Sequence, residues 1–400
     1  MKRWTRCFLL LSVFLFCFTG CGVLEEIGIT TDAFGNERSE EKENSSGLPT
    51  GYFEAESHGH FAYDRLTDAE KIWYRDINGL ISSANTEGMK LSTSGLEQGL
   101  TQDDIDRIYQ SVLQDHPEYF FVEGYEYVVY SADDEVVGIE IKMTTSLTVE
   151  EMKGRKEEIE VAAEQWLADA PKDGSDYEKI KYVYETIIFN TEYNMNASDN
   201  QNIYSVFCGQ SSVCQGYAKA TQYLLQELGV ECTLVLGSVN GGEGHSWNLV
   251  LADGEYYFVD TTWGDASYFS ADGALEYGQR PDISYDYLCV TSDQLFKTHE
   301  AKTASDLPHC YAEENNYYRR EGCFFTTYDE ALLESIIQKY YDVGEDFVSL
   351  KCADESVYVE MYGKLIEEQE IFAFLSEDYS TIAYIENEQQ LTLTFWMTNE

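Results

Sequence analysis

The chain has few basic residues and few prolines for its length. Of its 400 residues, 26 are lysine or arginine and 73 are aspartate or glutamate, so the formal net charge is −47. A chain this acidic repels the phosphate backbones of DNA and RNA, which excludes nucleic acid as the expected partner. With only five prolines and 29 glycines, collagen-like and proline-rich architectures are excluded as well.

Long hydrophobic runs are also missing. The apolar run at 8–18 covers about half of the roughly 20 residues that a membrane-spanning helix needs, and no later segment replaces it. It follows three basic residues, as in a secretory signal peptide, and residues 18–21 (FTGC) resemble a bacterial lipobox. We therefore expect lipidation of Cys21 and an exported protein anchored on the outer face of the cytoplasmic membrane, with simple secretion as the alternative.

Removal of the predicted signal peptide, residues 1–20, leaves 23 basic against 73 acidic residues, a net charge of −50. We therefore expect a neutral or cationic partner. The remaining chain is expected to have four parts. Residues 21–66 are polar with little apolar periodicity and are interpreted as a tether. Residues 67–171, 172–305 and 306–400 are expected to form an N-terminal α+β domain, a central domain and a C-terminal α+β domain.

Seven of the ten cysteines remain outside the signal peptide and the lipidation site. An odd number permits up to three disulfides and leaves one thiol free, but spacing does not give the pairing. Neither a Cys-x-x-Cys pair nor a His-x₃₋₅-His pair is present, which disfavours structural zinc, and no EF-hand loop occurs. We expect no metal and no cofactor.

Hydrophobic periodicity predicts the elements of the flanking domains. Helices are expected from Thr67 and over 101–115, 148–168 and 176–193, and paired strands over 119–130 with 135–143 and over 381–385 with 391–396. Nothing in these segments requires catalysis. The residues that suggest chemistry lie between Tyr204 and Asp265.

One cysteine lies at the predicted start of a helix. Apolar residues recur at helical spacing from Val213 to Leu228, and Gly229 follows where a helix C-terminus is expected. Cys214 therefore falls in the first turn. A free thiol has a pKa of about 8.5, and the positive end of a helix together with a nearby imidazolium favours the reactive thiolate. Cys214 is a candidate nucleophile; the alternatives are a buried apolar role or half of a disulfide.

A hairpin predicted downstream brings a histidine and an aspartate together. Asp253-Gly254 is a strong signal for a two-residue turn, and the residues on both sides have the pattern of strands. In that register His245 lies opposite Thr262, two residues beyond Asp260, so His245 and Asp260 share a face. The ring can accept the thiol proton while the carboxylate orients it. Taken singly, each residue could instead have a structural role.

Three blocks carry a family resemblance. Residues 213–218 (VCQGYA), 245–248 (HSWN) and 256–265 (YYFVDTTWGD) resemble the bacterial transglutaminase-like superfamily, in the order Cys, His, Asp. The resemblance covers about residues 176–300. It implies a papain-like α+β core, in which a helix bearing the nucleophile packs on an antiparallel sheet bearing the other two residues.

The resemblance also implies the chemistry. It makes 172–305 a catalytic domain that forms an acyl-enzyme on amides, with Cys214, His245 and Asp260 as the triad. An oxyanion hole is needed, and the backbone N–H of Cys214 is its natural first donor. Gln210 and Tyr204 are the two candidates for a side-chain donor.

The second substrate of such an acyl-enzyme is open. Attack by water gives a peptidase or amidase acting on proteins or cell-wall peptides, which is the expected function. Attack by a lysine amine gives a cross-linking transglutaminase instead, and the discriminating feature is whether the cleft excludes water. A different class of protein is a surface binding module in which the triad is vestigial.

Overall fold

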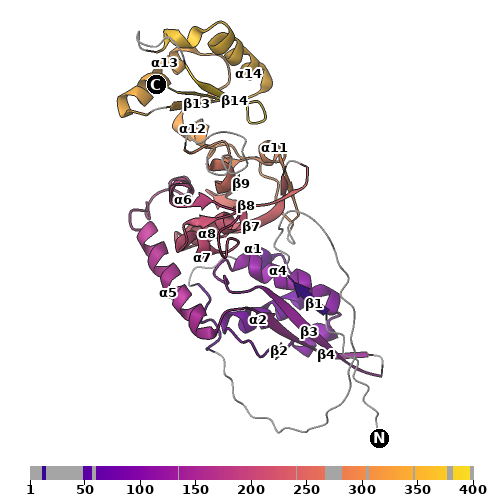
Figure 1. Ribbon diagram of the computed structural model, residues 1–400. Coiled ribbons are helices and arrows are strands. Elements are labelled where there is room, and N and C mark those ends of the chain that lie inside the picture. Colours follow the sequence, from indigo (N-terminus) through magenta and orange to yellow (C-terminus); the bar gives the residue numbers. More distant parts are fainter. Residues whose placement is uncertain are drawn as a thin grey trace. The chain divides into compact units, whose positions relative to one another are not determined.

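The chain folds into two compact units, residues 1–56 with 62–156 and residues 57–61 with 157–400 (Figure 1). The structure, a computed structural model, describes residues 11–14, 48–55, 60–133, 135–239, 241–265, 282–302, 306–345, 347–375 and 382–396. Cys21 and most of the predicted signal peptide lie outside these residues. Within the described ranges, no helix has the length and apolar character needed to cross a bilayer.

The first unit contains a four-stranded antiparallel sheet in the order β1-β3-β4-β2. Its elements are β1 (Leu11–Phe14), α2 (Asp68–Ser82), β2 (Met89–Lys90), α3 (Thr93–Glu97), the 3-10 helix η1 (Gln102–Asp104), α4 (Ile105–Asp115), β3 (Gly124–Ala132) and β4 (Glu135–Thr144). Two helices lie outside this list: the short α1 (Phe61–Asp64) begins at the boundary between the units, and the long α5 (Val149–Trp166) spans it. Strand β1 belongs to the segment interpreted as a signal peptide.

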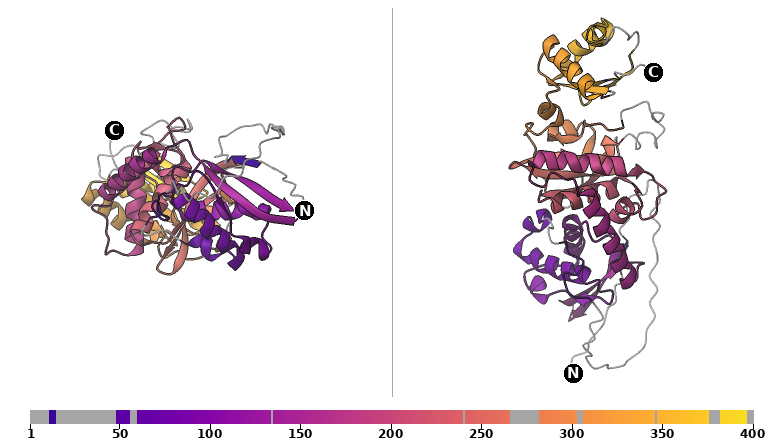
Figure 2. Two further views of the ribbon diagram at one scale, coloured as in Figure 1. Left: turned by 90° about the horizontal axis from the view of Figure 1, so that it is seen from below. Right: turned by 90° about the vertical axis from the view of Figure 1, so that its left-hand side faces the viewer.

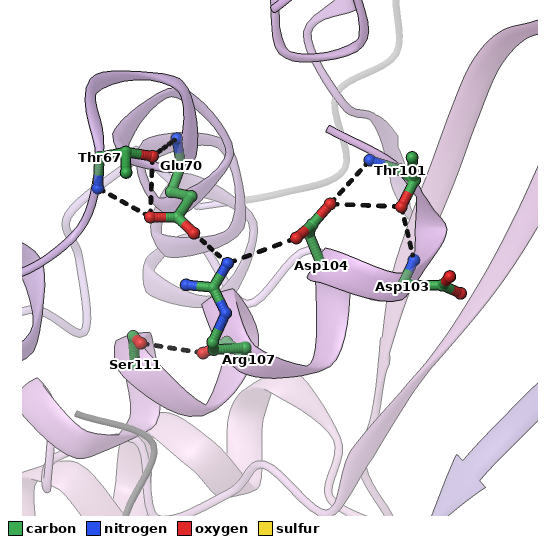
Figure 3. A network of polar contacts seen from close by, with 7 residues as sticks. All are labelled: Thr67, Glu70, Thr101, Asp103, Asp104, Arg107 and Ser111. Atoms are coloured by element: carbon green, nitrogen blue, oxygen red, sulfur yellow. Dashed lines mark hydrogen bonds and ion pairs between the residues drawn. The ribbon is translucent and has the colours of Figure 1, made fainter. Parts of the chain in front are cut away.

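The helices expected from Thr67 and over 101–115 are present, and their N-termini are joined by one arginine. Thr67 caps α2 through a capping box with Glu70, because a threonine hydroxyl and a glutamate three residues later satisfy each other's backbone N–H groups. Arg107 forms ion pairs with Glu70 and, at 3.3 Å, with Asp104 (Figure 3). The guanidinium therefore ties the start of α2 to the start of α4.

The predicted strand over 119–130 begins later than expected. Residues 119–122 form turns after α4, closed by backbone hydrogen bonds from Tyr119 to His116 and from Val122 to Tyr119, and β3 starts only at Gly124. The aromatic residues at 119–121 are buried. Aromatic side chains favour strands, but only as a tendency. At 119–121 they occur because the side chains are buried, and the strand prediction for these residues is wrong.

Two aromatic side chains near the end of the predicted tether at 21–66 are buried. Phe53 packs on Phe121 in the first unit, with ring centroids 4.7 Å apart. Phe61 belongs to the core of the second unit and contacts Tyr256. The described end of the segment is therefore packed because these rings have buried partners, whereas residues 21–47 lie outside the described part of the chain.

The second unit contains a five-stranded antiparallel sheet against which a helix packs. The sheet order is β10-β9-β8-β7-β11, and helix α8 lies against β7 and β8 with α6 on its other side (Figures 1 and 2). The elements are α6 (Asp176–Asn190), β5 (Glu192–Tyr193), α7 (Ile203–Phe207), β6 (Ser211–Ser212), α8 (Cys214–Glu227), β7 (Cys232–Val239), β8 (Glu243–Ala252), β9 (Glu255–Val259), α9 (Thr261–Gly264), β10 (Leu288–Val290), α11 (Ser292–Leu295) and β11 (His299–Ala301). This is the α+β core that the sequence predicts.

The hairpin register is confirmed. Ala252 pairs with Glu255 across the turn, and Asn248 pairs with Val259. Asp253 and Gly254 have φ values of 53° and 85°, as the left-handed positions of a two-residue turn require. Because the register is the expected one, His245 and Asp260 lie on the same face of the sheet.

The helix predicted over 176–193 is shorter than expected. Helix α6 ends at Asn190, and Thr191 has extended backbone angles. Residues Glu192 and Tyr193 form β5, which pairs in parallel with β6. Pairing with the segment just before Cys214 therefore outweighs the helical pattern at this end.

The C-terminal part of the second unit is a smaller α+β arrangement. Its sheet has the order β12-β13-β15-β14, and helices α13 and α14 lie on one side of it (Figure 2). Its elements are α12 (Tyr317–Glu321), β12 (Phe324–Phe325), α13 (Glu330–Val343), β13 (Phe347–Cys352), α14 (Glu355–Tyr362), a π-helical turn (Gly363–Glu367), a 3-10 helix (Glu370–Ala373), β14 (Tyr384–Asn387) and β15 (Thr392–Trp396). The expected pairing of the last two strands is confirmed.

Gly237 leaves room for a buried indole. It pairs with His245 on one side and Ala301 on the other, and a Cβ added there would overlap the ring of Trp247 and the carbonyl oxygen of Glu300. We expect Gly237→Ala to lower the free energy of unfolding by about 1–3 kcal/mol, because a core this dense cannot absorb the methyl group. Urea unfolding measures the change.

The control for this substitution is Gly154→Ala on the exposed face of α5. A Cβ there meets no atom within 4 Å, so the change should be neutral or stabilising by up to about 1 kcal/mol, since alanine is the better helix former. Equal stability of the two variants would contradict the steric role of Gly237.

Candidate active site

Cys214 is the first residue of α8, as predicted. Val213 before it has extended backbone angles, and Ser212 is held by a hydrogen bond from its hydroxyl to the Asn200 carbonyl at 2.7 Å. Gly216 is required next to this loop, because a Cβ there would overlap the Ser212 hydroxyl. The Cys214 thiol is partly exposed and free. Its backbone N–H belongs to the first turn, where helices leave such donors without internal partners.

His245 and Asp260 form a buried hydrogen-bonded pair. His245 lies on β8 and Asp260 directly after β9, and Nε2 of the ring is 2.7 Å from Oδ2 of the carboxylate. Their side chains are 3% and 0% exposed. His245 and Asp260, which the hairpin register places on one face as neighbours, are therefore in direct contact.

The other oxygen of Asp260 accepts two backbone hydrogen bonds. The N–H groups of Thr262 and Trp263 donate to Oδ1 at 3.0 and 3.1 Å, so Asp260 is also the N-cap of α9. An aspartate favours this position because its oxygen satisfies the unpaired N–H groups of the first turn. The cap fixes the plane in which Oδ2 faces the imidazole.

The electrostatics of the pair favour a charged ring. Burial opposes ionisation of both groups, yet the Asp260 carboxylate, with a smaller contribution from the Cys214 thiol, raises the pKa of His245 to about 10. Against the same burial, His245 and His299 hold the pKa of Asp260 below its usual value. At neutral pH the pair is therefore an imidazolium and a carboxylate.

The structure brings the predicted nucleophile to the same ring. The Cys214 thiol is close enough to the His245 ring to raise its pKa, and because Nε2 is occupied by Asp260, Nδ1 is the ring nitrogen left for the sulfur. The three predicted residues thus form one chain of contacts, from thiol to imidazole to carboxylate. A protonated ring beside a sulfur is the arrangement that stabilises thiolates in reactive cysteines.

The structure does not join the two candidate side-chain oxyanion donors to this chain of contacts. Gln210 is exposed and adopts a φ of 49°, and its backbone carbonyl accepts from the N–H of Glu192. The Tyr204 hydroxyl donates to Glu158 of α5 at 2.8 Å. The Cys214 N–H remains the donor that its helix position favours.

A second histidine contacts the aspartate and was missed from sequence. Nε2 of His299 lies 3.0 Å from the same Oδ2 of Asp260 that His245 contacts. His299 comes 39 residues after Asp260 and pairs with Val239 on a strand two positions away from β9 in the sheet. No local pattern marks it, because the hairpin fixes only β8 against β9. The pairing of β11 with β7 was the missing information.

His245, Asp260 and His299 also have the donor atoms of a transition-metal site. Their ligand atoms lie within 4.8 Å of one another and all three residues are buried. The nitrogen–oxygen distances of 2.7 and 3.0 Å are nevertheless those of direct hydrogen bonds, and both nitrogens converge on one oxygen. The two histidines and the aspartate therefore satisfy one another through direct hydrogen bonds, without an ion between them.

The seven cysteines that the structure describes are all free thiols. Five of them are buried, Cys208 is exposed and Cys214 is intermediate. None of the disulfides that the sequence allows has formed among these residues. The candidate nucleophile is therefore not tied to another sulfur.

The buried pair should make stability depend on pH. The pKa of His245 is about 10 in the folded chain and about 6.5 in an unfolded one, so its stabilising contribution is complete below pH 6.5 and is lost as the pH rises towards 10. We expect the free energy of unfolding to fall over this range by at least about 1 kcal/mol more in the wild type than in His245→Gln. Urea unfolding at several pH values measures the difference.

Comparing the two proteins cancels the titrating groups that do not interact with His245. Burial lowers the pKa of Lys351 to about 8, and this group contributes with the opposite sign in both. Identical pH dependence of the wild type and His245→Gln would show that the ring is neutral in the fold.

Known proteins share the segment that carries these residues. Residues 164–261 match the model of the transglutaminase-like superfamily. The chain is 27% identical to kyphoscoliosis peptidase from Mus musculus over 106 residues, which are 22% of this chain and 16% of that protein. The human protein of the same name is 26% identical over the same length. The match thus spans less than a fifth of these curated relatives.

Solved structures are similar at lower identity. The structure of a TGase is 15% identical, with a TM-score of 0.26, and the similarity covers 41% of this chain and 47% of that one. The periplasmic domain of TgpA from Pseudomonas aeruginosa is 13% identical, with a TM-score of 0.20, covering 39% and 73%. The family match contains Cys214, His245 and Asp260, whereas His299 lies beyond its C-terminal end.

Proposed function

Because residues 164–261 form a domain of the transglutaminase-like superfamily, we propose that the protein is a cysteine-dependent enzyme that cleaves amide bonds of peptides or proteins. The observation that carries this proposal is the chain of contacts from Cys214 through His245 to Asp260. Nε2 of the ring is held by the carboxylate and Nδ1 faces the sulfur, which is the geometry that a thiol nucleophile and its base require.

The proposed reaction begins with attack of the Cys214 sulfur on an amide carbonyl. The thiol proton resides on Nδ1 of His245, and the negative charge that develops on the carbonyl oxygen is stabilised by the Cys214 N–H. As the carbon–nitrogen bond breaks, His245 gives its proton to the departing amine. A thioester between Cys214 and the acyl group remains.

Water completes the proposed cycle. The neutral His245 removes a proton from a water molecule, whose oxygen attacks the thioester, and the sulfur leaves with the proton that the ring holds. The products are a carboxylic acid and the free enzyme. Throughout, Asp260 keeps the ring in one tautomer and stabilises its charged form.

The substrate class follows from charge and from the predicted location. With a net charge of −47, the protein attracts neutral or cationic peptides more readily than acidic ones. If Cys21 is lipidated on the outer face of the membrane, surface proteins and cell-wall peptides are the accessible substrates. Both the lipid anchor and the location belong to this proposal.

A glutamine-containing peptide, incubated with a labelled amine, tests the proposal. We expect release of ammonia or of a new amino terminus without much incorporation of the amine, and loss of both in Cys214→Ala. The matched control is Cys208→Ala, which removes an exposed thiol and should retain the wild-type rate.

Other outcomes would favour the alternatives. Abundant incorporation of the amine would make the protein a cross-linking transglutaminase. If the Cys214→Ala variant turned over as fast as the wild type, or if Cys214 reacted with iodoacetamide no faster than Cys208, the chain would be a binding module with a vestigial triad.

A further inference from the structure

His299 is a buried titratable group that the proposed reaction does not use. It begins β11, the edge strand that pairs with β7, and its side chain is 0% exposed. It lies outside the segment that matches the transglutaminase-like superfamily. Burial of an imidazole requires hydrogen-bond partners, and the partners of His299 are specific.

The first partner is the catalytic carboxylate of the proposed triad. Nε2 of His299 is 3.0 Å from Oδ2 of Asp260. An ionised carboxylate only accepts hydrogen bonds, so Nε2 must carry the hydrogen. Oδ2 thus receives N–H groups from two rings, and Oδ1 receives two from the backbone.

The second partner of His299 is the hydroxyl of Thr298, which lies beside Nδ1. Burial lowers the pKa of His299, and the positive charge of His245 lowers it further although Asp260 opposes the shift, so His299 is the neutral ring of the two. With its hydrogen on Nε2, Nδ1 is an acceptor. The Thr298 hydroxyl lies 2.7 Å from Nδ1 and 3.2 Å from the Leu295 carbonyl oxygen, so its one hydrogen is shared between these two acceptors.

Aromatic side chains hold the ring in place. The centroids of Trp263, Trp247 and Tyr287 lie 4.7, 4.9 and 5.5 Å from that of His299. The Tyr287 hydroxyl is 3.4 Å from the Thr298 hydroxyl. His299 is therefore held in one position by this packing and by its contacts with Asp260 and Thr298.

We propose that His299 is a positioning residue that holds the ionised Asp260 carboxylate against His245, and so keeps Nδ1 of His245 directed at Cys214. This inference rests on the proposed function and adds a fourth residue to its machinery. His299 acts through Asp260 and touches neither the thiol nor the substrate.

Loss of His299 should change the pH at which the Asp260 carboxylate takes up a proton. A hydrogen bond to the charged form of a carboxylate favours that form, so without His299 the Asp260 carboxylate should take up a proton at a higher pH and release His245. The titratable groups facing Asp260 are His245 from β8 and His299 from β11, with the hydroxyls of Tyr184 from α6 and Tyr287 before β10. Of these titratable groups, the two histidines are the ones that donate to its side chain.

Alkylation of Cys214 by iodoacetamide between pH 2 and 8 tests the proposal on the full chain. In His299→Leu, which has no donor, we expect the acid limb of the rate profile to move up by about one pH unit or more, a rate loss of about tenfold on that limb, as for a lost hydrogen bond to a charged group. His299→Gln, whose amide can donate to Asp260, should stay close to the wild type.

A second variant keeps the test decisive if His299→Leu does not fold. Thr298→Val has a similar volume but removes the hydroxyl that lies 2.7 Å from Nδ1 of His299, and should move the acid limb in the same direction by a smaller amount. A purely structural role would lower the rate equally at every pH. An acid limb at the wild-type position in Leu and Val variants that fold, or equal behaviour of Leu and Gln, would overturn the proposal.

The outcomes separate this inference from the proposed function. Alkylation needs no amide substrate, so a shifted acid limb in a protein that cleaves no amide would support the positioning role and refute the enzyme. Normal amide cleavage together with an unshifted acid limb in His299→Leu would support the enzyme and refute the positioning role.

Discussion

Replacing Asp260 by asparagine is expected to lower kcat by about 10³- to 10⁴-fold, the effect known for the aspartate of serine protease triads. Oδ1 of Asp260 accepts the N–H groups of Thr262 and Trp263, so the amide oxygen of an asparagine would take that side. Its NH₂ group would then face the two imidazole nitrogens that now donate to Oδ2.

The asparagine NH₂ group and the imidazole N–H groups are all donors, so they cannot form hydrogen bonds with one another. His245 could accept from the amide only as a neutral ring that has lost its Nε2 hydrogen and keeps one on Nδ1, which faces the sulfur, and such a ring cannot receive the thiol proton. The loss should therefore fall on kcat more than on KM, because the group acts on the chemical step. Steady-state kinetics with the glutamine-containing peptide measures this loss.

The matched control is Asp286→Asn. Asp286 is another buried carboxylate of the same unit, and it accepts hydrogen bonds from Tyr318, Asn387 and Thr392. Its replacement should lower stability while kcat of the folded protein changes little. A kcat of Asp260→Asn within tenfold of the wild type would contradict the role given to the carboxylate.

Truncation of Trp247 to alanine is expected to lower the free energy of unfolding by about 3–5 kcal/mol, the cost of removing a large buried ring. Trp247 is fully buried. It belongs to the core cluster of Phe61, Val235, Val239, Trp247, Leu249, Phe258, Trp263, Tyr287, Val290, Leu295 and Cys310. Its ring also packs against His245 and His299, with centroids 5.9 and 4.9 Å away, so fast alkylation of Cys214 should be lost too.

Phe189→Ala provides the comparison for Trp247. Phe189 is an aromatic residue of α6 with 61% of its surface exposed, and its truncation should change stability by no more than about 0.5 kcal/mol. Denaturant unfolding of both variants decides the matter. A Trp247→Ala protein within about 1 kcal/mol of the wild type would show that the cluster does not support the site.

The sequence predicted most of the site where the relevant contacts are local. A two-residue turn determines which residues of β8 and β9 face each other, so the approach of His245 to Asp260 followed from counting residues. The start of α8 at Cys214 followed in the same way from helical spacing and the glycine after it. In both cases a few adjacent residues decide the geometry.

Contacts between distant segments could not be predicted. His299 reaches Asp260 only because β11 pairs with β7, and strand order in a sheet depends on packing of the whole domain. For the same reason the helical pattern at 176–193 gave no sign that its last residues pair with β6. The buried rings at 119–121 likewise satisfied the strand pattern while lying in turns.

The complete burial of Asp260 separates two responses to ionic strength. At physiological salt, mobile ions screen surface charges over about 8 Å but reach buried pairs far less. The acidic exterior, which would gather cationic peptides, should lose its attraction as salt is added. The ion pair between Asp260 and His245 should persist. Added salt should therefore weaken binding of the substrate and leave the rate of bond cleavage in the bound complex unchanged.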